Sequence, residues 1–184
     1  MKKEIKEILL DEKQLDVIVS RLAEQIDRDY ADRRLVLVSI LKGSVMFTAA
    51  LMGKLENNAE IEFMKVSSYG AQTTSSGYIS VLLDLKRNDL AELDLLIIED
   101  IIDSGRTLNL LTNLLRERGA RSVRTCTLLD KPSRREVPFT PDYVGAEIPD
   151  EFVVGFGLDY AERFRNLPYV GILHPDVYTG EVKA

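Results

Sequence analysis

Acidic residues crowd the end of one apolar stretch of this sequence. In residues 95–108, LLIIEDIIDSGRTL, the adjacent Glu99 and Asp100 follow an apolar run and Asp103 comes three positions later. Carboxylates this close repel one another, so their presence indicates a function. Ser-Gly-Arg-Thr then leads into a helical pattern, where backbone N–H groups and the helix dipole favour an anion. The glycine lets the backbone approach that anion closely. The sequence therefore predicts a phosphate site beside an acid pair.

The type of phosphate ligand follows by elimination. A Walker A loop needs a glycine five positions before its Gly-Lys-Ser/Thr, and that position holds Asp100. A G-x-G-x-x-G dinucleotide motif after the first strand is also absent. Carboxylates accept hydrogen bonds from a cis-diol, and Mg²⁺ offsets their charge, so a ribose 5-phosphate fits. The alternative is that the acid pair is merely solvated and Asp103 caps the helix.

Hydrophobic periodicity predicts the elements that position this motif. Apolar residues at helical spacing indicate an amphipathic helix up to about Tyr30, and the apolar run at 35–40 indicates a central strand. Ser44 is placed to cap the next helix, and Gly119 suits the position just after a helix over 106–119. Further strands are expected at 60–67, 79–84, 93–99, 122–130, 142–148 and 169–173, the last three closing the sheet. This order predicts an α/β fold, a mainly parallel sheet flanked by helices, with the ligand at the carboxyl ends of the strands.

Composition narrows the function classes. The chain has 184 residues, 45% of them hydrophobic, which fits one domain with a sizeable core. Its 24 basic and 30 acidic residues give a net charge of −6, which disfavours a protein that grips nucleic acid. Cys126 is the one cysteine, and the charged start lacks a signal-peptide pattern, so we expect a cytoplasmic protein. No apolar stretch approaches the roughly 18 residues that span a bilayer.

Several segments of the sequence resemble those of a known family. The stretch LLIIEDIIDSGRTL is similar to the phosphoribosyl-pyrophosphate signature of the type I phosphoribosyltransferases, and other segments resemble their hypoxanthine-guanine members. These segments are SILKGS, SSYG, LLDKPSRR and PDYVGAEIPDEFVVGFGLDYAERFRNLPYVGIL. The resemblance implies one domain over residues 1–184, with a core at about 30–150 and a small hood built from the N-terminal segment and about 150–184. It also implies transfer of phosphoribosyl from phosphoribosyl pyrophosphate to hypoxanthine or guanine, with Mg²⁺ as cofactor.

The resemblance implies a role for each residue of the phosphate motif. Glu99 and Asp100 match ligands of the ribose hydroxyls and of Mg²⁺, and Asp103 matches the residue against purine N7, a general base or proton acceptor. The residues that would wrap the 5-phosphate are Asp103, Ser104, Gly105, Arg106 and Thr107. Arg106 stands where many relatives have lysine, a minor departure because the backbone supplies most of the grip.

Pyrophosphate contacts are implied in other segments. Lys42 and Gly43 lie in Leu-Lys-Gly, where the family has a non-proline cis peptide, and Arg165 matches a second contact. Without the resemblance, Lys42 and Arg165 read as surface charges, and Arg163 is a weaker candidate for the same contact.

The polar stretch at 67–78, SSYGAQTTSSGY, contains few groups able to pack and is longer than a hairpin turn. It is predicted to be a mobile lid over the reacting centre. Ser68 and Tyr69 match the start of the family's catalytic loop and are implied to contact pyrophosphate.

Purine contacts are implied towards the end of the chain. Lys131 would donate to the purine O6, Phe152 would stack on the ring, and the Val153 main chain would read its edge. Asp159 matches a second magnesium ligand. Without the resemblance, Phe152 would be interpreted as a residue of the hydrophobic core, Lys131 as a solvated loop cation and Asp159 as a turn residue.

Two other readings remain open from sequence. One is a regulator on the same fold that binds nucleotides and RNA, which would need a basic face. The other is a signalling receiver domain, which the phosphate motif and the lack of a separate phospho-acceptor aspartate disfavour. The partners expected here are a purine base and phosphoribosyl pyrophosphate, with no nucleic acid and no membrane. The resemblance also implies a homodimer or homotetramer.

Overall fold

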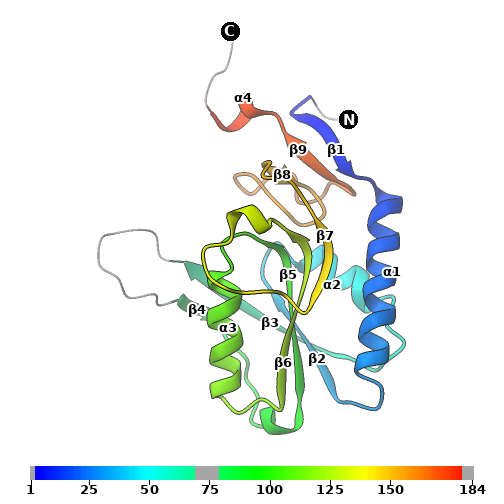
Figure 1. Ribbon diagram of the computed structural model, residues 1–184, viewed down its shortest axis with the longest axis vertical. Coiled ribbons are helices and arrows are strands. Elements are labelled where there is room, and N and C mark those ends of the chain that lie inside the picture. The colour runs from blue at the N-terminus through cyan, green and yellow to red at the C-terminus, as the bar shows by residue number, and fades with distance from the viewer. Residues whose placement is uncertain (1–2, 69–78, 180–184) are drawn as a thin grey trace.

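The computed structural model describes residues 3–68 and 79–179 (Figure 1). Within these residues, the larger sheet has six strands in the order β4-β3-β2-β5-β6-β7. They are β2 (Leu35–Ile40), β3 (Glu60–Ser68), β4 (Ile79–Leu83), β5 (Asp94–Ile102), β6 (Ser122–Asp130) and β7 (Tyr143–Glu147). All neighbours are parallel except β3 and β4. This sheet, flanked by helices, confirms the predicted α/β fold.

Helices cover both faces of the sheet. They are α1 (Glu12–Asp29), α2 (Val45–Met52) and α3 (Arg106–Glu117), with short turns η1 (Leu90–Glu92) and η2 (Pro132–Arg134) and a final helix α4 (Pro175–Tyr178). Every residue of β2 is buried. Alternate β2 side chains pack in two cores, Leu35 and Leu37 with α1 and α2, and Val36 and Val38 with α3. No helix in the described ranges is long and apolar enough to cross a membrane.

A second sheet lies above the carboxyl ends of the parallel strands (Figure 1). Its strands are β1 (Ile5–Leu10), β9 (Val170–Leu173) and β8 (Val153–Val154), in the order β1-β9-β8. The expectation that 169–173 closes the main sheet is wrong, because β9 pairs antiparallel with β1 and β8 instead. A fully buried strand has the same sequence pattern in either sheet, so periodicity cannot assign its partner.

Two local expectations also differ from the structure. Ser44 precedes α2 but makes no side-chain cap, because its hydroxyl donates to the Ile40 carbonyl at 2.6 Å and hydrogen-bonds to the Ser39 hydroxyl at 2.8 Å. Strand β5 was expected to end at residue 99 and continues to Ile102. Glu99 therefore lies inside the strand, where it is paired with Thr127 of β6, and this pairing fixes its position.

Candidate active site

The acid pair of β5 opens into two cavities. Asp100 is 8% exposed and lines a cavity of about 500 Å³, while Glu99 lines a smaller one of about 140 Å³. Asp103 lines both. The side chains predicted to bind sugar, purine and metal that line the larger cavity are Asp100, Asp103, Lys131, Phe152, Val153 and Asp159. The fold thus brings together residues from β5, from the segments that follow β5 and β6, and from β8 and its neighbouring segments.

The environment of the two carboxyls disfavours their charged forms. Burial, and then the charge of Asp100 and a hydrogen bond to it, raise the pKa of Glu99 well above its usual range. Burial also raises the pKa of Asp100, although the Ile101 N–H donates to its carboxyl at 2.8 Å. Glu99 Oε2 is buried and has no hydrogen-bond partner within the described chain. The pair is therefore suited to a hydroxyl donor or a cation.

The loop after β5 forms the smaller cavity. Gly105 has φ of +78°, a left-handed conformation that favours glycine, and α3 starts at the next residue. Ser104, Gly105 and Thr107 line the cavity together with Glu99. Asp103 is not the helix cap, since Gly105 holds that position and makes no side-chain capping bond. The guanidinium of Arg106 pairs with Glu136 at 2.6 Å at the surface.

The segment after β6 lies against this loop. The Lys131 N–H donates to the Ile102 carbonyl at 3.0 Å, and the Glu136 N–H donates to the Ser104 carbonyl at 3.0 Å. Lys131 is 8% exposed, and its Nζ lies 3.8 Å from Oδ1 of Asp103. Two side chains predicted to face a purine edge are thus adjacent in space.

An aromatic cluster forms part of the wall of the larger cavity. The Phe152 ring stacks on Tyr178 with centroids 5.2 Å apart, and Tyr160 meets it edge-on at 5.6 Å. Phe152 and Tyr178 both line the cavity, as do Arg134 and Asp150, which pair at 3.7 Å. Sequence reasoning missed Tyr178, Arg134 and Asp150, because no local pattern marks them as cavity residues.

A glycine-rich contact joins the sheet to the hairpin that follows β8. The peptide bond between Leu41 and Lys42 is cis. A Cβ added at Gly43 would lie 1.6 Å from Oδ2 of Asp100, and one added at Gly157 would lie 1.9 Å from the Gly43 carbonyl oxygen. Only glycine allows the Asp100 side chain to approach the backbone at Gly43, and the backbone at Gly157 to approach that of Gly43, so closely.

The predicted pyrophosphate residues converge beside this contact. Lys42 Nζ lies 3.0 Å from Glu162 Oε2, and the Arg165 guanidinium lies 2.8 Å from Asp159 and 3.3 Å from Glu162. Arg165 also donates to the Gly157 carbonyl at 2.9 Å. Arg163, the weaker candidate, instead lies 3.7 Å from Glu4. The structure therefore favours Arg165 for an anion shared with Lys42.

The side chains also fit a divalent cation that is held partly by substrate. Over residues 3–68 and 79–179, no group of three His, Cys, Asp or Glu side chains could hold a metal by itself. Two adjacent carboxyls, with one buried oxygen unpartnered, instead match a cation that takes its remaining ligands from substrate oxygens and water.

The catalytic-loop prediction falls mostly on residues without a description. Tyr69 and the rest of residues 69–78 lie outside the described residues. Ser68 is the last residue of β3, where it pairs with Ile79.

Comparison with known proteins assigns the class. The phosphoribosyl transferase domain family matches residues 6–161, and the chain belongs to this family. Within it, the chain is similar to a hypoxanthine-guanine phosphoribosyltransferase of Streptococcus mutans, 49% identical over 97% of this chain and 99% of the relative. A solved hypoxanthine phosphoribosyltransferase of Staphylococcus aureus superposes with a TM-score of 0.90 at 47% identity, covering 95% of each chain. The Trypanosoma cruzi enzyme, solved with the product IMP, gives 0.89 at 40% identity over 97% of this chain and 99% of that chain.

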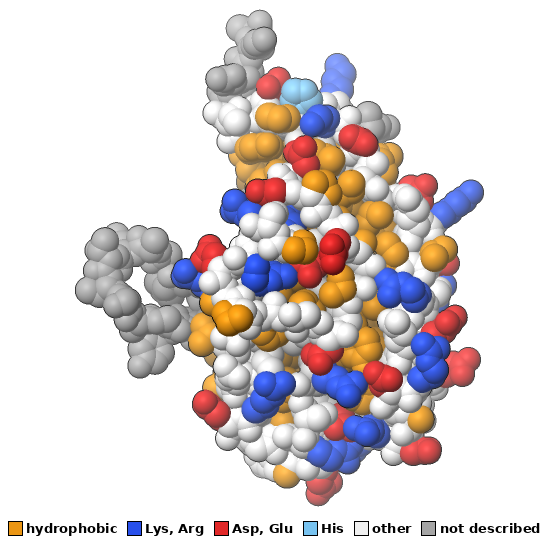
Figure 2. Space-filling view, in the orientation of Figure 1, with side chains coloured by type: hydrophobic (Ala, Val, Ile, Leu, Met, Phe, Trp, Pro, Cys, Tyr) orange, Lys and Arg blue, Asp and Glu red, His pale blue; other side chains and the backbone are white. Residues whose placement is uncertain are grey.

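These comparisons also bear on the rival readings. The relatives named above are phosphoribosyltransferases, and none of them supports the RNA-binding regulator. Figure 2 shows acidic and basic side chains interspersed over one face of the molecule, without a continuous basic stripe.

Proposed function

We propose that this chain transfers the 5-phosphoribosyl group of phosphoribosyl pyrophosphate to hypoxanthine or guanine, forming IMP or GMP and pyrophosphate. The observation that carries the proposal is one cavity of about 500 Å³ in which Asp100 and Asp103 face Lys131 and Phe152. A ribose beside Asp100 and a purine beside Lys131 and Phe152 would adjoin in it, and the 5-phosphate would lie in the smaller cavity, which Asp103 also lines. The likeness to a neighbour solved with IMP supports the same reaction.

The acid pair acts on the sugar. As pyrophosphate leaves, the anomeric carbon acquires oxocarbenium-like positive charge, which two nearby carboxylates stabilise. Glu99 and Asp100 would also accept hydrogen bonds from the ribose hydroxyls, and this supplies the partner that Glu99 Oε2 lacks. The backbone N–H groups of the loop at 103–107 bind the 5-phosphate at the start of α3.

The cofactor of the proposal is Mg²⁺. Glu99 and Asp100 would hold it on one side and Asp159, through water, would hold a second ion. When bound, the cation shields the charge of pyrophosphate and favours its departure. Placing a cation beside the acid pair lowers the pKa of both carboxyls, which burial otherwise raises.

Two side chains recognise the purine edge. As N9 of the purine forms its bond to the anomeric carbon and the bond to pyrophosphate breaks, Asp103 accepts the proton that N7 loses, and Lys131 donates to O6. Their separation of 3.8 Å suits groups that face neighbouring atoms of one ligand. Phe152 stacks on the ring, and the Val153 main chain contacts its remaining edge.

Pyrophosphate binds between the side chains of Lys42 and Arg165 and the backbone N–H at Gly43. Lys42 and Arg165 share Glu162 as a partner, and this carboxylate holds them side by side at 3.0 and 3.3 Å. An incoming pyrophosphate replaces Glu162 as the partner of both cations. The backbone at Gly43 contributes N–H donors close to the acid pair.

A product assay tests the proposal. The protein is incubated with phosphoribosyl pyrophosphate, Mg²⁺ and hypoxanthine, guanine, xanthine or adenine in turn, and the nucleotide is identified by mass. We expect IMP and GMP and little AMP. The absence of any nucleotide, combined with salt-dependent RNA binding in a gel shift, would instead favour the regulator.

The proposal extends to assembly and location. We propose that the chain forms a homodimer or homotetramer, on the basis of the resemblance and of the apolar side chains exposed on α2 and β3, such as Met46 and Phe63. We also propose, on the basis of the resemblance, that it works in the cytoplasm. Light scattering of the purified protein measures the assembly. A mass of 20.8 kDa, that of one chain, would contradict it.

A further inference from the structure

We propose that Arg135 is a positioning residue that sets the spacing between Asp103 and Lys131, and thereby the recognition of the purine edge. The inference rests on the proposed function, because it concerns how these two groups meet the purine. It starts from a partly buried arginine that is not among the residues lining either cavity described above.

The guanidinium of Arg135 joins two acceptors. Nη1 donates to the main-chain carbonyl of Asp103, and Nη2 donates to the carboxylate of Asp130. The side chains of Arg135 and Asp130 are only 16% and 9% exposed. A planar guanidinium that is fixed at both nitrogens holds its two acceptors in one relative geometry.

The acceptors stand at the ends of neighbouring strands. Ile102 of β5 and Asp130 of β6 are paired in the sheet. Asp103 and Lys131 are the first residues after these two strands. Arg135 therefore links the ends of the two strands, directly beside the two side chains that are proposed to contact the purine.

The same side chain also covers the phosphate loop from behind. A Cβ added at Gly105 would lie 2.9 Å from Cδ of Arg135. The neighbouring Glu136 and Val137 N–H groups both donate to the Ser104 carbonyl, at 3.0 and 3.3 Å. The segment is thus held by main-chain bonds, and Arg135 adds the connection to Asp103 itself.

Asp103 depends on this connection for its position. Its side chain is 51% exposed and meets Lys131 at 3.8 Å, longer than a hydrogen bond. The main chain therefore determines where the carboxylate lies. N7 and O6 are on one edge of a 6-oxopurine, so acceptor and donor must keep a fixed separation, and an error of about 1 Å can cost about 100-fold in rate.

The test compares Arg135→Gln with a matched arginine. Arg118, directly after the C-terminal end of α3, donates through two nitrogens to Asp84 at 2.6 and 2.8 Å. We expect Arg135→Gln to lower kcat by about 10- to 100-fold and to raise the KM for hypoxanthine more than the KM for phosphoribosyl pyrophosphate. Arg118→Gln should keep wild-type kinetics.

A double-mutant cycle separates positioning from a general loss of structure. In a Lys131→Ala background, one of the two groups to be spaced is gone, so Arg135→Gln should change the KM for hypoxanthine by less than about twofold. If the change is the same with and without Lys131, or if Arg135→Gln leaves this KM unchanged, the inference is wrong.

Folding is checked by thermal denaturation of each variant. Should Arg135→Gln fail to fold, the cycle is run with Arg135→Lys, whose single ammonium keeps the charge beside Asp130 but cannot reach both acceptors. An unchanged KM for hypoxanthine in Arg135→Lys overturns the inference. A wild type that forms no nucleotide is a different outcome, since the proposed function itself then fails.

Discussion

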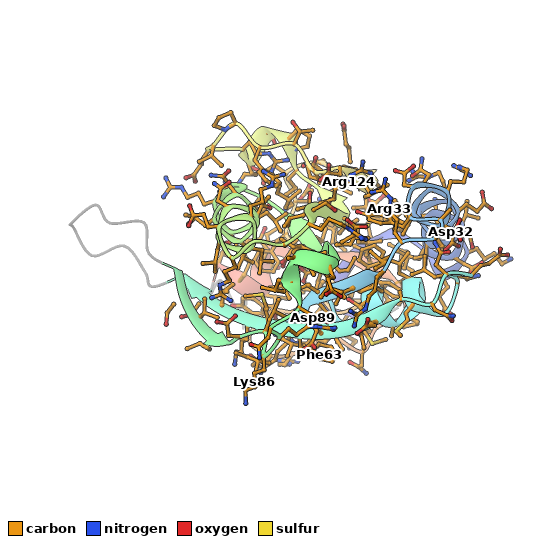
Figure 3. All side chains as sticks on the ribbon, turned by 90° about the horizontal axis from the view of Figure 1, so that it is seen from below. Asp32, Arg33, Phe63, Lys86, Asp89 and Arg124 are labelled. Atoms are coloured by element: carbon orange, nitrogen blue, oxygen red, sulfur yellow. The ribbon has the colours of Figure 1, made fainter. Side chains whose placement is uncertain are left out.

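Strand β5 carries a buried acid, Asp94, at its start and the acid pair Glu99 and Asp100 near its end, and these acids have different hydrogen-bond partners. Asp94, at its start, is fully buried and accepts hydrogen bonds from Arg121 at 2.5 Å and from the Ser122 hydroxyl at 2.6 Å. Arg33, a further partner at 3.9 Å, is labelled at this end of the molecule in Figure 3. Near the other end of the strand, Glu99 Oε2 has no partner within the described chain.

The pKa shifts of these acids differ in sign. Burial would raise the pKa of Asp94, but hydrogen bonds from Arg121 and Ser122 outweigh it and lower the pKa. Burial and the charge of Asp100 raise the pKa of Glu99. An acid whose hydrogen bonds are all made by the protein stabilises the fold, whereas an acid with one buried oxygen left unpartnered is available to a ligand. One strand thus has a structural end and a functional end.

The largest test of this contrast is Asp103→Asn at the functional end. The substitution keeps the shape of the side chain and removes the proton acceptor, so kcat should fall by about 10² to 10⁴. The melting temperature should stay within a degree or two of wild type, because the side chain is half exposed. A kcat within a few-fold of wild type between pH 6 and 9 would place the proton acceptor elsewhere.

Lys131→Ala should change selectivity at the same end. An ammonium offers donors only, which suits the O6 of hypoxanthine and leaves the lysine unpaired against the amino group of adenine. Losing a hydrogen bond to a charged group costs about 1.5 to 3 kcal/mol, so the preference for hypoxanthine over adenine should shrink about 10- to 150-fold. Steady-state kinetics with each base measures it, and an unchanged ratio would show that Lys131 does not read the base.

Asp94→Asn should behave in the reverse way at the structural end. It removes the negative charge and one of the two oxygens that accept from Arg121, and it should lower the free energy of unfolding at pH 7 by about 1 to 3 kcal/mol, with kcat unchanged. Because the folded pKa is lowered, the stabilisation is present above about pH 4 and is lost as the pH falls through the folded value. Urea unfolding at pH 7 and pH 3 checks both points. A variant as stable as wild type at pH 7 would show that Asp94 does not stabilise the fold.

Glu99→Gln should give the opposite sign. A raised folded pKa means that stability falls as the pH rises from about 4 through that folded value. In a metal-free buffer, the variant should therefore melt at a higher temperature than wild type at pH 8, and the difference should vanish towards pH 4. It should also turn over more slowly. If Glu99→Gln is less stable than wild type at pH 8, Glu99 is structural like Asp94.

The sequence predicted the position of the acid pair and of the loop before α3 better than the position of the segments around them, for physical reasons. Glu99, Asp100 and the phosphate loop are contiguous, so their chemistry is legible in one stretch, and the β5–β6 register then brings Lys131 to Asp103. The Ser44 prediction failed because the Ile40 carbonyl, set by the fold, competes for its hydroxyl.

The upper sheet and the cavity wall depend on contacts across the whole chain. Strand β1 pairs with β9 through partners such as Ile5 and Leu173, which are far apart in sequence. Tyr178 reaches the cavity only because that pairing carries α4 to Phe152. No local pattern encodes such a contact, so the sequence could not identify it.

Tyr178 offers the smallest and last test, because it extends the comparison to a wall that acts by packing. Its ring lies 25° from parallel with Phe152, and an aromatic pair of this kind contributes about 0.5 to 1.5 kcal/mol. Tyr178→Leu should therefore raise the KM for hypoxanthine about 2- to 10-fold, while kcat and the KM for phosphoribosyl pyrophosphate stay near wild type. Phe152→Leu, as the comparison variant, should raise the same KM further. A KM lower than that of wild type in Tyr178→Leu would show instead that Tyr178 occupies the ring face that the purine needs.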